Sequence, residues 1–255
     1  MRLVRQEPSR HGVARSRWRL ADLRAASPAL AGYSLSGVSR ALRRLGVRLK
    51  RGRLRLHSPD PAYAEKAERV ARVLALARGH PRRVALWFGD EVSCYRQPTL
   101  AGRWHPAPEE PTADLSHRAN TRHRVAGALD AVSGRVVRVA GSKAGVAKLR
   151  QFLRALRAAD PDRRIFLAWD NWPVHAHPDV PDEAARLRIR LLWLPTYAPW
   201  ENPIEKLWRW LKQTVLHHHR LADAWDGLKA AIGSFLDRFA HGSDDLLRYV
   251  GLLPI

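Results

Sequence analysis

The sequence lacks the features that mark secreted, membrane and nucleotide-binding proteins. It has one cysteine, Cys94, so it cannot hold a disulfide framework, and it fits a reducing compartment. No apolar run approaches the roughly 18 residues of a membrane span, and the basic N-terminus lacks the apolar centre of a secretory signal. Neither GxGxxG nor GxxxxGKS/T occurs, so no nucleotide cradle is indicated. We expect a cytoplasmic protein without a membrane partner.

Acidic residues are also scarce relative to basic ones. The chain has 45 Lys and Arg against 24 Asp and Glu, a formal net charge of +21 and a pI of about 11.4. Most of the basic residues are arginine, which favours bidentate contact with phosphate. This balance predicts a polyanionic partner, most naturally nucleic acid. The alternative is a GC-rich genome that encodes arginine wherever a surface charge is tolerated.

The positive charge is concentrated at the N-terminal end. Residues 1–60 carry 15 Lys and Arg against three acidic residues, a net charge of +12. Ser58-Pro59-Asp60-Pro61 is a strong turn signal, and we place a domain boundary there. We therefore predict a basic DNA-binding region over residues 1–60, then a linker helix over 61–80 and a larger domain over 81–255.

The basic region shows the pattern of a helix-turn-helix domain. Residues 17–26 and 34–45 have helical spacing of apolar positions, with Ser34 or Ser36 as the cap of the second helix and Gly46 after its end. Val38, Leu42 and Leu45 would form its buried face. A basic run over 47–57 follows, as a wing would. A generic basic helical hairpin is the alternative. The expected DNA contacts are Ser36, Ser39, Arg40, Arg43, Arg44, Arg48, Lys50, Arg51 and Arg53.

The larger domain reads as a mixed α/β fold. We expect strands at 84–88 with a continuation over 92–96, a short element at 102–105, and strands at 124–130, 135–140, 164–169 and 189–194. We expect helices at 145–159, 182–188, 203–217 and 221–239, with a helical tail from 243. An antiparallel meander followed by alternating helices and strands predicts a ribonuclease H-like mixed five-stranded sheet with flanking helices, preceded by the small all-α, winged helix-turn-helix domain. A doubly wound dinucleotide fold does not have this order.

Three carboxylates stand where this fold would bring them together. Asp90 and Asp170 each follow an apolar run, and Glu205 lies at the start of a patterned helix. Phosphodiester cleavage commonly uses two metal ions, and Mg²⁺ prefers hard oxygen ligands. Each residue also has a structural interpretation: a strand-to-turn pair for Asp90, an Asx turn for Asp170, and a capping box with Asn202 for Glu205.

Four segments resemble a known family. They are GDE at 89–91, WDNWPVH at 169–175, LPTYAPWENPIEKLW at 194–208, and the reader-like stretch over 33–66. The first three are similar to the acidic motif, the D-N-x-x-x-H motif and the P-x-Y-S-P-x-x-N-P-I-E-x-x-W motif of the insertion sequence 630 transposases, within the mariner-like DDE superfamily. Thirty-four residues separate Asp170 from Glu205, the spacing of that family. The sequence departs from the family at Trp172, Ala198 and Glu201. The resemblance also implies that the basic region over residues 1–60 is incomplete at its N-terminal end, because it holds only the later of the family's two helical readers.

The resemblance implies a function. Asp90, Asp170 and Glu205 would be a catalytic, metal-binding triad for Mg²⁺, with Mn²⁺ as a substitute and two ions expected. Glu91, Asn171, His175 and Asn202 would lie around it, to orient Asp170 or contact the DNA backbone. The implied reaction cuts a phosphodiester at the element's end, and the freed 3′-hydroxyl then attacks target DNA. The partners would be double-stranded DNA, as terminal repeats and target, and a second copy in a homodimer. A nucleoid-associated location in a prokaryote follows.

Other interpretations stay open at this point. One alternative is a truncated or co-opted protein that binds DNA and is catalytically silent. The other is a ribonuclease H-like nuclease that cuts without strand transfer. The run His217-His218-His219 suggests a metal site, but it lacks a Cys partner and H-x-x-x-H spacing, so a solvated helix end is the better interpretation.

Overall fold

Two compact units make up the chain, Met1–Arg55 and Leu56–Ile255. The computed structural model describes residues 2–50, 57–143 and 145–254. The boundary between the units falls just before the Ser-Pro-Asp-Pro turn.

The first unit contains the two predicted helices. They are α1 (Leu20–Ala26) and α2 (Leu35–Arg44), and they pack against each other. Ser34 caps α2, because its Oγ accepts a hydrogen bond from the Gly37 N–H at 3.1 Å. Gly46 follows the helix with a φ of +75°, which glycine adopts without strain. Val38 is buried as expected, whereas Leu45 is 53% exposed, so its assignment to the buried face was wrong.

The predicted wing is only partly described. Residues 47–50 form no strand, and residues 51–56 lie outside the described residues.

The second unit is built on the expected mixed five-stranded sheet, in the order β3-β2-β1-β4-β5. Pairing is antiparallel from β1 to β2 and from β2 to β3, and parallel from β1 to β4 and from β4 to β5. The strands are β1 (Val84–Tyr95), β2 (Arg122–Asp130), β3 (Val136–Gly141), β4 (Arg164–Trp169) and β5 (Ile189–Trp193).

The strands differ from the sequence prediction at two places. Strand β1 runs unbroken from Val84 to Tyr95, so the proposed continuation over 92–96 belongs to it. The short element expected at 102–105 was wrong, because these residues are exposed and lie in the long loop between β1 and β2. An isolated apolar residue such as Trp104 gives no strand without a partner to pair with.

Six helices accompany the described sheet. They are α3 (Tyr63–Gly79), α4 (Val146–Ala159), α5 (Asp179–Arg186), α6 (Ile204–Leu211), α7 (Trp225–Asp237) and α8 (Asp244–Val250). The long helix predicted at 203–217 keeps α-helical geometry only to Leu211 and then forms a π-helical segment, Lys212–Leu216. No helix in the described ranges is long and apolar enough to cross a membrane.

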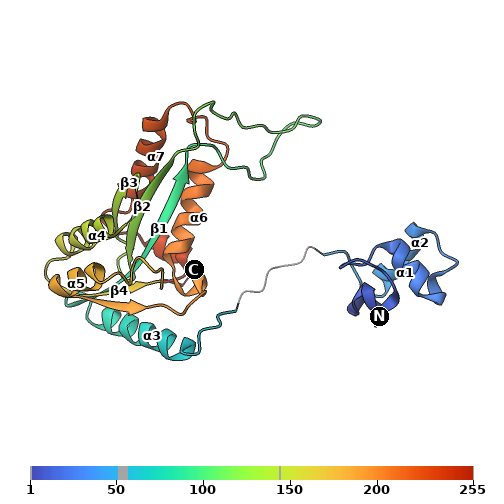
Figure 1. The fold of residues 1–255 in the computed structure, drawn as a ribbon, viewed down its shortest axis with the longest axis horizontal. Coiled ribbons are helices and arrows are strands. Elements are labelled where there is room, and N and C mark those ends of the chain that lie inside the picture. The colour runs from blue at the N-terminus through green and yellow to red at the C-terminus, as the bar shows by residue number, and fades with distance from the viewer. Residues whose placement is uncertain (1, 51–56, 144, 255) are drawn as a thin grey trace. The chain divides into compact units, whose positions relative to one another are not determined.

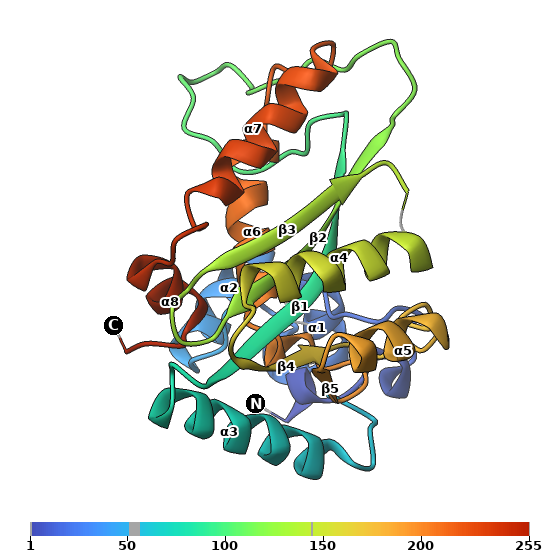
Figure 2. The same cartoon turned by 90° about the vertical axis from the view of Figure 1, so that its left-hand side faces the viewer.

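The helices cover both faces of the sheet (Figures 1 and 2), and a separate hydrophobic core lies on each face. Helices α4 and α5 pack on one face, and α3, α6, α7 and α8 contribute to the core on the other. Successive side chains of a strand point to opposite faces, so Leu86 and Phe88 enter the second core while Ala85 and Trp87 enter the first. The same alternation sends Asp90 towards α6 and Glu91 towards the opposite face.

Helix α3 coincides with the expected linker helix but is packed on the second unit. Its Val70 and Ala77 side chains are buried in the core beside β1. The two apolar positions lie seven residues apart, which places them on one side of a helix. The segment therefore helps build the larger domain rather than standing free beside it.

The approach of α6 to the sheet depends on Gly127, which generates our first prediction. Gly127 pairs with Asp90 across β2 and β1, and a Cβ there would lie 2.6 Å from the Trp208 ring. Gly127→Ala should therefore destabilise the protein by about 1–3 kcal/mol, as overpacking of a tight core does. Chemical denaturation measures the effect. Gly102→Ala is the control, because nothing lies within 4 Å of its added methyl group; equal stability of the two variants would contradict this packing.

Candidate active site

The three acidic residues singled out from the sequence line one pocket. Asp90, Asp170 and Glu205 share it with Asn171 and Asn202, and the cavity measures about 440 Å³. Its other lining residues are Trp172 and Pro173, which follow β4, and the segment 194–199, which follows β5. The pocket thus lies at the carboxyl ends of the parallel strands β4 and β5, where mixed α/β sheets commonly place their ligands.

Strand register explains why Asp90 and Asp170 meet. The last paired positions of β1 and β4 are Phe88 and Ala168. Asp90 and Asp170 each follow two residues later, so both stand at the level where β4 ends. Glu205 arrives from the first turn of α6, which is fixed by the burial of Ile204 and its neighbours in the core above β1.

Asp90 is the most buried carboxylate of the three. Its Oδ2 accepts a hydrogen bond of 2.8 Å from the Trp208 indole N–H. Burial raises the pKa of Asp90 well above its usual value, and the negative charges of Glu205, Glu91 and Asp170 add to this rise. Nothing in the sequence indicated this hydrogen bond between Trp208 and Asp90. An indole N–H beside a strand-end carboxylate is not visible in a linear sequence.

Glu205 faces the same pocket, and its carboxylate has no hydrogen bond or ion pair with the described residues. Its pKa is raised, chiefly by burial and also by Asp170, while Lys212 and Arg209 oppose the shift. The capping-box interpretation is wrong: no side chain caps α6, and the Asn202 amide instead donates to the Gly89 carbonyl of β1 at 2.9 Å. Asn202 therefore joins the start of α6 to β1, and the Glu205 side chain takes no part in capping the helix.

Asp170 combines both interpretations drawn from the sequence. Its Oδ1 accepts from the Trp172 backbone N–H at 3.2 Å, which is an Asx turn, and the residue also lines the pocket. The same oxygen lies 2.8 Å from Nδ1 of His175. Burial alone would raise the pKa of Asp170, but the contact with His175 outweighs it and lowers the pKa.

His175 is held rigidly behind the pocket. Its ring stacks on Trp169 with centroids 3.8 Å apart and meets Trp172 edge-on. Its Nε2 lies 3.1 Å from Oε2 of Glu91 on the neighbouring strand. Burial opposes the charged form, yet the contacts with Asp170 and Glu91 raise the pKa of His175 to about 9. His175 thus lies between the carboxylates of Asp170 and Glu91, and its role in orienting Asp170 stays a prediction.

A second support reaches the pocket from the segment before α3. Asn171 donates to Oγ1 of Thr196 at 2.9 Å. The Thr196 backbone N–H donates to Oδ2 of Asp60 at 2.8 Å, and Ser58 donates to the Thr196 carbonyl at 2.5 Å. Asp60 also pairs with Lys66 at 2.8 Å. Sequence analysis assigned residues 58–61 only to a domain boundary, and no local signal marks their contact with Thr196.

The donor set suits a hard divalent cation. Three carboxylates face one cavity, and oxygen ligands of this kind are those that Mg²⁺ prefers. Oδ2 of Asp170 and both oxygens of Glu205 accept no hydrogen bond from the described residues. In their present orientations, however, no three Asp, Glu, His or Cys side chains of the described ranges are grouped tightly enough to hold one ion. The residues present therefore fit a metal in their chemistry and share one pocket, but their side chains would have to move to hold a single ion.

The expected DNA contacts of the first unit are mostly on its surface. Ser36, Arg40, Arg43, Arg44, Arg48 and Lys50 are exposed, and Ser39 is half-buried. Arg51 and Arg53 lie outside the described residues.

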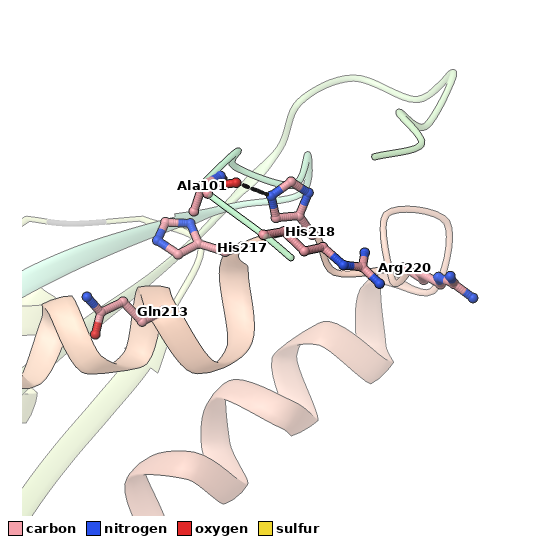
Figure 3. Close-up of a pocket in the computed structure, with 7 residues that line it drawn as sticks. Ala101, Gln213, His217, His218 and Arg220 are labelled. Atoms are coloured by element: carbon pink, nitrogen blue, oxygen red, sulfur yellow. Dashed lines mark hydrogen bonds between the residues drawn. The ribbon is translucent and has the colours of Figure 1, made fainter. Parts of the chain in front are cut away.

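The histidine run is not a metal cluster in this structure. Figure 3 shows His217 and His218 beside Ala101, at the rim of a pocket that also contains Gln213 and Arg220. Nδ1 of His217 lies 2.8 Å from the Thr99 hydroxyl, and Nε2 of His218 lies 2.7 Å from the Ala101 carbonyl. These histidines fasten the β1–β2 loop to the end of the π-helical segment.

The Asp60 network yields the second prediction. Asp60→Ala should lower the Tm by several degrees, because it removes the acceptor for the Thr196 N–H and the partner of Lys66. Asp60→Asn should lie between, since an amide oxygen still accepts from Thr196. Thermal unfolding measures both. Asp226→Ala is the control, because Asp226 forms an exposed ion pair with Lys229. If Asp60→Ala and Asp226→Ala melt together, Asp60 does not hold the pocket wall.

Comparisons with known proteins agree with this arrangement. The chain is 27% identical to the "Insertion element IS630 uncharacterized 39 kDa protein" of Shigella sonnei, over 89% of this chain and 66% of that protein. It therefore spans just under two thirds of that relative's length.

The fold is that of solved transposase structures. The Mos1 transposase paired-end complex with left transposon end is similar with a TM-score of 0.65, at 21% identity, covering 96% of this chain and 78% of the other. The Mos1 mariner paired end complex with Mn is similar with a TM-score of 0.64, at 21% identity, covering 93% and 71%. The model of the DDE superfamily endonucleases matches residues 85–226, more than half of the chain. The chain belongs to the DDE superfamily endonuclease family, and its resemblance to the insertion sequence 630 transposases is confirmed.

Proposed function

We propose that this chain is a metal-dependent DNA transposase, which cuts phosphodiester bonds at the ends of its element and joins the freed 3′-hydroxyl to target DNA. The observation that carries the proposal is the meeting of Asp90, Asp170 and Glu205 on one pocket, in a chain of the DDE endonuclease family. The relative from an insertion element and the fold of the Mos1 transposase complexes support it.

Asp90, Asp170 and Glu205 would hold two divalent metal ions, either Mg²⁺ or Mn²⁺. The titles of two similar Mos1 complexes name Mn and Mg, which supports both cations here. When bound, such ions activate the attacking oxygen and steady the leaving oxygen of a phosphodiester. Burial and the neighbouring carboxylates make the negative charge of Asp90 unfavourable. A bound cation would neutralise that charge, which further favours cation binding.

The surrounding residues position the carboxylates and the strand. Trp208 fixes one oxygen of Asp90, and His175, itself braced by Glu91, fixes one oxygen of Asp170. Arg209 and Lys212 follow Glu205 by about one and two helical turns and are exposed. Their positive charges would attract the DNA backbone to the pocket without occupying the metal ligands.

The first unit would supply DNA recognition. Its helix α2 exposes arginines at 40, 43 and 44, and the second helix of such a unit is the one that enters the major groove. Two element ends must be held together for transposition, so we propose that the active form on DNA is a homodimer. Solved paired-end complexes of the Mos1 transposase support this arrangement.

A cleavage assay gives the third prediction. The substrate is a labelled duplex carrying the DNA that flanks the chain's own reading frame, with Mg²⁺ or Mn²⁺ added. Asp170→Asn and Glu205→Gln should each lower cleavage about 10³-fold or more, because each removes a ligand worth several kcal/mol in the transition state. Both variants should bind the duplex as tightly as the wild type. Asp237→Asn, which changes an exposed carboxylate of α7, serves as the control and should cleave normally.

The products of the same assay separate the alternatives. Cleaved and joined products support transposition. Cleavage without joining would identify a ribonuclease H-like nuclease, and metal-independent binding without any cleavage would identify a catalytically silent DNA-binding protein. Either result would overturn the proposed reaction.

Metal binding can be tested without catalysis, which is the fourth prediction. A ligand that binds only the folded state at about 100 times its Kd stabilises it by about 2.7 kcal/mol. Mn²⁺ should therefore raise the Tm of the wild type. The double variant Asp90→Asn/Asp170→Asn should show a much smaller rise, since two of three carboxylates are removed. An equal rise in both proteins would place the metal elsewhere.

A further inference from the structure

A second charged cavity lies at the opposite ends of β4 and β5 from the carboxylate pocket. It measures about 790 Å³, and six of its eleven lining residues are arginines. Asp162 is the one acidic residue among them. We call it the arginine hollow, and its arginines are Arg157, Arg163, Arg164, Arg186, Arg188 and Arg190.

Three of these arginines are committed to the fold. The Arg157 guanidinium donates to the carbonyls of Leu187 at 2.8 Å and Arg188 at 3.0 Å, and it also bonds the loop before β4. Arg163 pairs with the buried carboxylates of Asp130 and Asp160. Arg186 pairs with Glu183. These contacts fix the two loops that border the hollow, so its floor is rigid before any ligand arrives.

The other three arginines are available. Arg164, Arg188 and Arg190 are exposed, and among the described residues none of their side chains has a hydrogen bond or an ion pair. Arg190 and Phe166 are register partners on β5 and β4, with the guanidinium 5.8 Å from the ring. Arg164 precedes Phe166 by two residues, so Arg164 and Arg190 lie on the same sheet face.

Arg188 is displayed by an unusual backbone. Its φ is +55°, in the left-handed region that non-glycine residues rarely occupy. The turn is held by the bond between the Arg188 carbonyl and Arg157. Arg188 lies beside two other arginines in the hollow and has no carboxylate partner among the described residues. Such a group of positive charges favours the binding of an anion.

We propose that the arginine hollow is a second DNA-binding site, which grips the phosphate backbone of duplex DNA away from the carboxylate pocket. Arginine binds phosphate through two parallel N–H donors, and the three exposed arginines around one hollow could each contact a backbone phosphate. The six residues of β4 span about 20 Å between the two sites. A phosphate in the hollow is therefore not the one that is cut.

The proposal rests on DNA as the substrate but not on cleavage, so the two can fail separately. Each phosphate contact contributes about 0.9 to the slope of log K against log salt for duplex DNA. The full-length triple variant Arg164→Gln/Arg188→Gln/Arg190→Gln should therefore lose about two to three units of slope. Fluorescence anisotropy with a labelled duplex of unrelated sequence, from about 50 to 200 mM salt, measures it.

A charge-matched control isolates the site from net charge. Arg69→Gln/Arg72→Gln/Arg248→Gln removes the same charge from exposed helical arginines that already pair with carboxylates, and it should keep the wild-type slope. Should the triple variant unfold, the single variant Arg190→Gln should still lose about 0.9 unit. Asp170→Asn should bind with the wild-type slope, whatever its cleavage. Equal slopes for the hollow and control variants would overturn the proposal.

Discussion

The parallel pairing of β1 with β4 is the constraint on which the rest of the second unit depends. The last register pair is Phe88 with Ala168. Asp90 and Asp170 each follow two residues later, so both lie at the same edge of the sheet. A slip of one residue would turn Asp90 to the face that α4 and α5 cover and send Glu91 towards α6. The carboxylate pocket, the hydrogen bond from Trp208 and the contact between Glu91 and His175 all require the register that is present.

Helix α6 completes the site because its apolar packing holds the helix in place and so positions the Glu205 carboxylate. Its apolar side chains enter the core over β1, Gly127 leaves room for the Trp208 ring, and Asn202 joins its start to the Gly89 carbonyl. The Glu205 carboxylate is thus held beside two others, although burial, and then repulsion by neighbouring carboxylates, raises the pKa of Asp90 and of Glu205. A cluster of like charges sustained by the surrounding packing is typical of sites that bind a cation or perform acid-base chemistry.

Much of this could be read from the sequence. Strand alternation and helix periodicity predicted the five strands, and motif spacing placed Asp90, Asp170 and Glu205 together. The failures have physical causes. The capping box was wrong because the Asn202 amide had a better partner on β1, and a linear pattern cannot show a tertiary competitor. Asp60 and Thr196 are 136 residues apart, so their contact left no local signal. The arginine hollow was hidden for the same reason, since its arginines gather from two segments of the chain, 157–164 and 186–190.

We propose that Asp90, Asp170 and Glu205 form one metal site, and a crystal structure of the protein with Mn²⁺ would test this through the anomalous scattering of the ion. We expect anomalous peaks in the carboxylate pocket, with oxygens of all three residues among the ligands. Mn²⁺ bound only at other sites, such as the histidines at 217–219, or liganded without Asp90 and Asp170, would contradict it.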